Sequence, residues 1–130
     1  MGVIGQQGGG GGKDQGDVKP TNITSTDTTD IVDPLSGSTA YAKFNAQRFE
    51  GLILFNDHAD QATAKVYHHD GTSTQTQFYQ SVLTTKETEL LDDEYWMVLD
   101  RNGKIQVAVS TTGTTGIDVN VIARVTRVWI

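Results

Sequence analysis

The stretch Tyr95–Ser110 constrains the fold of this chain more than any other part of its sequence. Two runs of strand-forming residues flank Asn102-Gly103, a pair that accepts positive φ at little cost and fits the twist of a two-residue hairpin turn. After this pair, apolar residues alternate with more polar ones over Ile105–Val109, as they do in a strand that buries one face. The stretch therefore predicts a β-hairpin, and with it a β-protein.

Other segments after Ser38 repeat this signal. Leu52–Phe55 is a continuous apolar run, which predicts a strand buried on both faces, whereas Ala62–His68 and Ile117–Val125 alternate as half-exposed strands do. Roughly eight strands at intervals of about 8–12 residues, with no helical period, are typical of a sandwich or barrel. We therefore predict an all-β fold, an antiparallel and jelly-roll-like β-sandwich of about eight short strands over residues 38–130.

The first 37 residues differ in composition from the rest of the chain. Nine of the 14 glycines lie there, five of them in the run Gly8–Gly12, and the Thr- and Asp-rich stretch Thr21–Asp30 follows. Such a segment has too little apolar surface to offset its ordering entropy, so residues 1–37 are predicted to form an extended or flexible N-terminal arm. A disordered tail without function is the alternative. Isolated apolar residues along the arm are candidates for binding pockets on a partner: Val3, Ile4, Val18, Ile23, Ile31, Val32 and Leu35.

The charge and cysteine content exclude several classes of protein. The net charge is −6, which argues against nucleic acid as a partner, because phosphate binding needs a basic surface. The chain has no cysteine, so it forms no disulfide or thiolate metal site. No apolar run reaches the length of a membrane span, and the N-terminus lacks the pattern of a secretory signal. We therefore expect no nucleic acid and no membrane among its partners.

Two short motifs resemble ligand-binding loops without matching them. The glycine run ends in Gly12-Lys13, but Asp14 follows where a phosphate-binding loop needs Ser or Thr for magnesium. Asp100–Lys104 begins like a calcium loop, but apolar residues follow and the bidentate Glu is missing. We predict a docked or flexible arm for the first motif and a hairpin turn for the second.

Histidines and carboxylates gather at two predicted turns, at Asp57–Asp60 and His68–Asp70. Their side chains are suitable ligands for zinc, but neighbouring histidines on a strand point to opposite faces, and the spacing matches no known metal site. Solvated turns are therefore the preferred interpretation, and no metal or other cofactor is expected. The chain also lacks a nucleophile with a base at recognisable spacing, so we predict that it is not an enzyme and has no catalytic residues.

Aromatic residues suggest a further alternative, a carbohydrate-binding β-sandwich. Tyr67, Tyr79, Tyr95, Trp96 and Trp129 are the rings that such a surface would use. Trp96 lies in an apolar strand, so we expect it in the core. Trp129, beside an apolar terminus, is predicted to contact another subunit.

The order of these segments resembles that in small phage virion proteins with a β-sandwich or jelly-roll fold. In those proteins an apolar strand runs into an Asn-containing polar turn, as Leu52–Asp57 does here, and an alternating strand follows, as at Ala62–His68. A connection from leucine through a short turn to glutamate, here Leu83–Glu87, precedes a strand of the pattern Ile-x-Val, here Gly103–Ser110. A last alternating strand closes the sandwich, here Ile117–Val125.

The resemblance implies a structural virion protein, foremost a capsid decoration (cement) protein that stabilises the phage head. A tail, neck or fibre-associated module is the alternative within the same class. The resemblance further implies synthesis in the host cytoplasm, a place on the capsid surface and association into a homotrimer. Its N-terminal arm would contact the major capsid protein, with scattered apolar residues as anchors.

Overall fold

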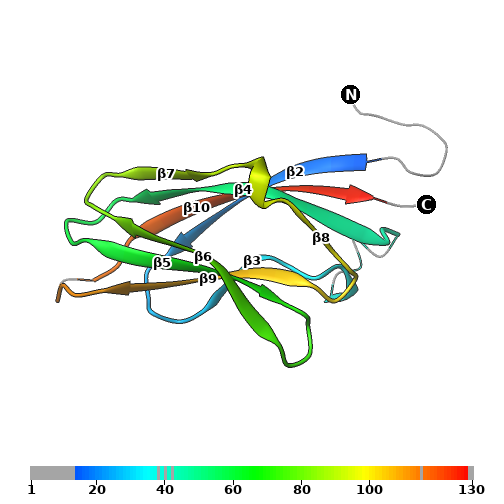
Figure 1. Cartoon of the computed structure of the whole chain (residues 1–130), viewed down its shortest axis with the longest axis horizontal. Helices are drawn as coiled ribbons and strands as arrows, with labels where there is room; N and C mark the ends of the chain where they lie inside the picture. Colours follow the sequence, from blue (N-terminus) through cyan, green and yellow to red (C-terminus); the bar gives the residue numbers. More distant parts are fainter. Residues whose placement is uncertain (1–13, 38, 40, 42, 115, 129–130) are drawn as a thin grey trace.

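The computed structural model describes residues 14–37, 39, 41, 43–114 and 116–128, which form two antiparallel sheets packed on each other (Figure 1). In this part of the chain, the five-stranded sheet contains β2 (Asp14–Ile23), β4 (Ala46–Asn56), β7 (Thr88–Leu91), β8 (Met97–Leu99) and β10 (Val119–Val128). The four-stranded sheet contains β3 (Thr29–Val32), β5 (Ala62–His69), β6 (Gln75–Leu83) and β9 (Lys104–Thr111). Two short 3-10 turns, η1 (Leu35–Gly37) and η2 (Asp93–Tyr95), lie between strands. The predicted antiparallel β-sandwich is confirmed.

The strand order of the two sheets is that of a jelly roll. β10 lies between β2 and β4 in one sheet, and β9 lies between β3 and β5 in the other. β7 and β8 both pair with β4, one with Leu52–Phe55 and the other with Gln47–Phe49, so together with η2 they form a single interrupted edge strand. Two of the described strands, β2 and β3, precede residue 38, so the predicted count of about eight strands in residues 38–130 is too high: the structure describes seven there.

Alternating residues of the central strands fill the space between the sheets. The side chains of β9 that were predicted to face inward, Ile105, Val107 and Val109, are buried. β5 and β10 alternate in the same way, with buried residues at every second position. The apolar faces of the two sheets therefore meet in one core, and burial of this area is the main stabilising term of the fold.

The predicted hairpin at Asn102-Gly103 is wrong. β8 pairs with β4, whereas β9 pairs with β3 and β5, so the strands on either side of this turn lie in different sheets. Neither Asn102 nor Gly103 has a positive φ. Instead, Oδ1 of Asp100 accepts hydrogen bonds from the backbone N–H groups of Asn102 and Gly103, both at 2.9 Å. This aspartate-based turn carries the chain from one sheet to the other.

Residues 14–37 form part of the sandwich, although the sequence predicted them as part of the arm. β2 pairs with β10 from Asp14 opposite Val128 to Ile23 opposite Val119. β3 pairs with β9 in the other sheet. The boundary of the sandwich therefore lies ahead of the predicted Ser38. The segment looks polar in sequence because β2 and β3 are edge strands, which contribute few residues to the core.

Candidate assembly surfaces

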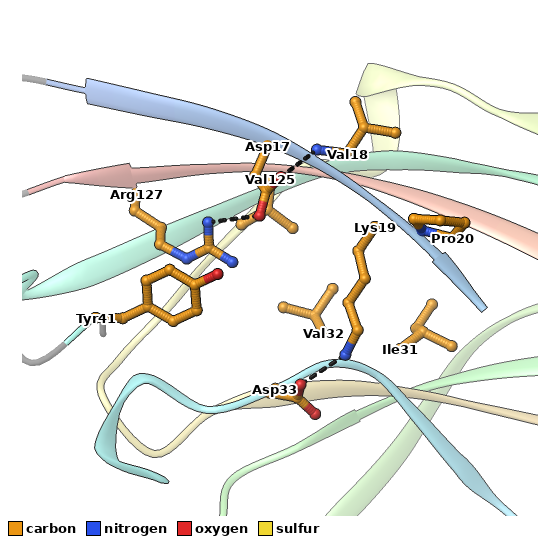
Figure 2. Close-up of a pocket in the computed structure, with 10 residues that line it drawn as sticks. All are labelled: Asp17, Val18, Lys19, Pro20, Ile31, Val32, Asp33, Tyr41, Val125 and Arg127. Atoms are coloured by element: carbon orange, nitrogen blue, oxygen red, sulfur yellow. Dashed lines mark hydrogen bonds and ion pairs between the residues drawn. The ribbon is translucent and has the colours of Figure 1, made fainter. Parts of the chain in front are cut away.

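A pocket opens between the edges of the two sheets, where β2 and β3 leave one side of the sandwich uncovered (Figure 2). It encloses about 240 Å³. The buried side chains of Ile31, Val32 and Val125 form its apolar inner wall, and Val18 and Pro20 of β2 border it, with the Val18 side chain pointing away from it (Figure 2). An apolar cavity of about 150 Å³ already accepts benzene, so this pocket has room for one or two aliphatic side chains.

Two charged pairs lie at the rim of the pocket, one between the two sheets and one between neighbouring strands of the five-stranded sheet (Figure 2). Nζ of Lys19 on β2 lies 2.6 Å from the carboxylate of Asp33, just after β3. The guanidinium of Arg127 donates a hydrogen bond to Asp17 at 3.0 Å and stacks 3.8 Å from the ring centre of Tyr41. The two pairs neutralise the rim, so the pocket favours an apolar group rather than a charged one.

The Arg127 side chain is the most buried cation in these pairs. It is 7% exposed, and among the described residues its Nε has no hydrogen-bond acceptor. A buried donor without an acceptor costs free energy. The pocket therefore combines an apolar inner wall with a buried guanidinium whose Nε has no acceptor among the described residues.

The outward face of the five-stranded sheet carries a row of apolar side chains across four strands. Register places Pro20, Ile122, Ile53 and Leu90 next to one another on β2, β10, β4 and β7. Leu90 is 64% exposed and Ile53 is 36% exposed. The predicted burial of Leu52–Phe55 on both faces is therefore wrong, because no second layer covers this side of β4 in the described part of the chain.

The sequence-predicted anchors fall into three groups. Val18, Ile31 and Val32 all border the pocket, but the side chain of Val18, 58% exposed, points away from it, and the other two are buried in its inner wall. Ile23 and Leu35 are buried in the core and do not line the pocket. Val3, Ile4 and Trp129 lie outside the described residues. The sequence thus pointed to the pocket through three of its residues, but it did not indicate Tyr41, Val125 or Arg127, which come from distant segments.

The polar clusters that were considered as metal ligands hold turns together. Nδ1 of His58 accepts a hydrogen bond from the backbone N–H of Asp60, and Nδ1 of His69 accepts one from Gly71. Oδ1 of Asp70 accepts hydrogen bonds from the backbone N–H groups of Thr72 and Thr74, which hold the pKa of Asp70 well below its usual range. Within the described ranges, no group of three or more His, Asp or Glu residues is arranged to hold a metal ion.

The aromatic residues are not gathered into one surface. Tyr79 and Tyr95 pack edge to face with ring centres 5.4 Å apart, and the Tyr79 hydroxyl donates a 2.9 Å hydrogen bond to Glu89. Trp96 was predicted in the core but is 50% exposed, because it lies between η2 and β8 with Arg48 stacked 4.5 Å from its ring centre. Desolvation, assisted by the bond from Tyr79 to Glu89, raises the pKa of Tyr79 to about 12.

In the part of the chain that the structure describes, no helix is long and apolar enough to cross a lipid bilayer.

Comparison with known proteins assigns a fold but no family. No family model matches the sequence, and no curated protein matches it. The chain is similar to one in the acidic stable capsid of Helicobacter pylori bacteriophage KHP30, with a TM-score of 0.56 and 9% identity over 89% of this chain and 94% of that one. It is also similar to a chain of the disulfide-linked pili of Bacillus endospore appendages, with a TM-score of 0.50 and 12% identity over 98% and 97%. A chain of the cyanophage Pam1 capsid gives a TM-score of 0.48 and 19% identity over 98% and 93%. At these identities the likeness shows the fold alone.

Proposed function

We propose that this protein is a structural component of a phage virion, and specifically a capsid decoration (cement) protein. The observation that carries the proposal is the jelly-roll fold, which the chain shares along nearly its whole length with a chain of a phage capsid. Two features of the sandwich surface support a role in assembly: the apolar pocket and the exposed apolar row. An acidic outer-shell protein also has no need to contact packaged DNA.

The proposed attachment arm is shorter than the sequence alone suggested. Residues 14–37 are part of the sandwich, so the arm comprises residues 1–13, with Val3 and Ile4 as its anchors. Fully extended, thirteen residues span at most about 45 Å, enough to reach from one subunit to a neighbour. In this proposal the arm binds the major capsid protein, and the protein associates with itself as a homotrimer on the capsid surface.

The test is to locate the protein in purified particles and then to remove the arm. Cryo-electron microscopy should show many copies spread over the head. Deletion of residues 1–13 should abolish binding to undecorated capsids, whereas the melting temperature of the isolated sandwich should be unchanged. Thr112→Ser, a change in the exposed loop after β9 and away from the arm in sequence, serves as the matched control. Unchanged capsid binding by the deletion variant would refute the attachment mechanism.

Two alternatives predict different results in the same experiments. A tail, neck or fibre-associated module would appear as a few copies at one vertex rather than over the shell. A carbohydrate-binding domain is favoured by one observation, the half-exposed ring of Trp96 beside Arg48. In that case a glycan array would show binding that Trp96→Ala abolishes.

A further inference from the structure

The four edges of the two sheets differ in how they are protected against pairing with another strand. Edge strands in natural proteins are shortened, interrupted or supplied with charges and proline, because free backbone N–H and C=O groups recruit further strands. β2 contains Asp17, Lys19 and Pro20, and β3 has only four residues. The edge formed by β7 and β8 is interrupted by η2. Three of the four described edges therefore carry such protection.

The fourth edge, β6, has little protection against pairing with another strand. Gln75–Leu83 is nine residues long and contains no Asp, Glu, Lys, Arg or Pro. It pairs only with β5 among the described strands. One irregularity, a register shift opposite Val66 and Tyr67, is the only interruption of this pairing. Its residues are mostly Gln, Thr, Ser, Val and aromatic, which suit a strand without repelling a neighbour.

We propose that β6 is a self-association surface, on which β6 of a second copy pairs antiparallel across a two-fold axis. The sandwich of one copy would then continue into that of the next through a sheet of eight strands, twice the four of one copy. A two-fold contact sets each residue of β6 against a residue of the same strand, so any charge on it would meet a like charge nearby. A chain of net charge −6 repels its own copies over most of its surface, and β6 is a long edge where this repulsion is weakest.

The inner side of β6 is anchored to the rest of the sandwich, and its free edge bends at the register shift beside Phe78. Phe78 packs against Phe49 of the core with ring centres 6.2 Å apart, and Tyr79 is bound to Glu89 on β7. Thr76 and Val82, by contrast, are exposed. The contact is independent of the virion role: it joins two copies or, if the protein is a trimer, links one trimer to the next.

The proposal is tested with charges of opposite sign on β6. Thr76→Lys/Val82→Lys and Thr76→Glu/Val82→Glu place like charges on both copies, at positions opposite His68 and Thr63 of β5. Each variant alone should associate about tenfold more weakly than the natural protein in sedimentation equilibrium, because opposed like charges destabilise strand pairing. An equal mixture of the two variants should regain association, since Lys then faces Glu. Thr26→Lys, which adds a charge in the exposed loop between β2 and β3, should leave association unchanged.

Several results would overturn the proposal. A natural protein that stays monomeric at millimolar concentration excludes self-pairing, and β6 variants that associate as strongly as the natural protein exclude this edge. Pairing through β6 is also excluded if the mixture fails to regain association while both variants have the melting temperature of the natural protein. If the variants do not fold, amide exchange in the natural protein decides: protection of residues 76–82 must rise with protein concentration, and constant protection refutes the pairing.

Discussion

Asn56 offers the sharpest test of how this sandwich is held together. Its side chain is fully buried at the end of β4, and its amide group donates to the carbonyls of Asp60 at 2.9 Å, Leu83 at 3.1 Å and Thr84 at 3.2 Å. Its Oδ1 accepts a hydrogen bond from the backbone N–H of His58. One side chain therefore ties the β4–β5 turn to the end of β6, joining the two sheets.

The expected cost of Asn56→Ala follows from these contacts. The two amide protons make at least two net hydrogen bonds, each worth about 0.5–1.5 kcal/mol, and the loss of a donor to the buried carbonyl of Leu83 adds about 1 kcal/mol. We expect a total loss of roughly 2–4 kcal/mol in the free energy of unfolding. For a domain of this size the melting temperature should fall by about 6–16 °C.

Urea unfolding followed by circular dichroism measures this loss directly. Asn45→Ala is the matched control, because Asn45 is exposed and its backbone hydrogen bond to Val128 remains. Asn56→Asp should cost more than Asn56→Ala at neutral pH, because it replaces the donors with a buried negative charge facing carbonyl oxygens. If Asn56→Ala and Asn45→Ala lose the same free energy, the interpretation of Asn56 as a tie between the sheets is refuted.

Three further predictions concern other parts of the sandwich. Gly51→Ala should lower the free energy of unfolding by about 1–3 kcal/mol, because Gly51 has φ +123° and a Cβ there would clash with the carbonyl oxygen of Leu91. A loss in urea unfolding no larger than that of a typical surface change would contradict this. The raised pKa of Tyr79 means that the neutral phenol is favoured in the fold, so its contribution is complete below pH 10 and is lost as the pH rises towards 12. Thermal melts over this range should fall more steeply for the natural protein than for Tyr79→Phe, and equal slopes would exclude the effect. Asp33→Ala should lower the free energy of unfolding by less than about 1 kcal/mol, because the Lys19–Asp33 pair is solvent-exposed. A larger loss in urea unfolding, or a loss that added salt does not reduce, would contradict this and show that the pair closes the pocket rim.

The sequence predicted the layers of this fold better than it predicted the partners of each strand. Alternation over Ile105–Val109 and Ile117–Val125 correctly indicated which face is buried, because strand periodicity is a local property. The turn at Asn102-Gly103 was misread, since the side chain of Asp100 determines its shape and the sheet to which each strand belongs depends on distant segments. Strands at sheet edges are also hard to recognise, because so few of their residues are apolar.

The pocket could be predicted only in part for the same reason. Val18, Ile31 and Val32 stood out as isolated apolar residues in a polar segment, and all three border it. Their partners Val125 and Arg127 come from β10, near the other end of the chain, and only the pairing of β2 with β10 brings the two sets together.

The central position of β10 also determines when this protein can fold during synthesis. β10 is the last strand along the described chain, yet it lies between β2 and β4 and pairs with both. Until residues 119–128 have left the ribosome, β2 has no strand to pair with and β4 lacks one neighbour. Folding should therefore follow synthesis of the sandwich rather than accompany it, and arrested nascent chains ending before residue 119 should remain sensitive to protease.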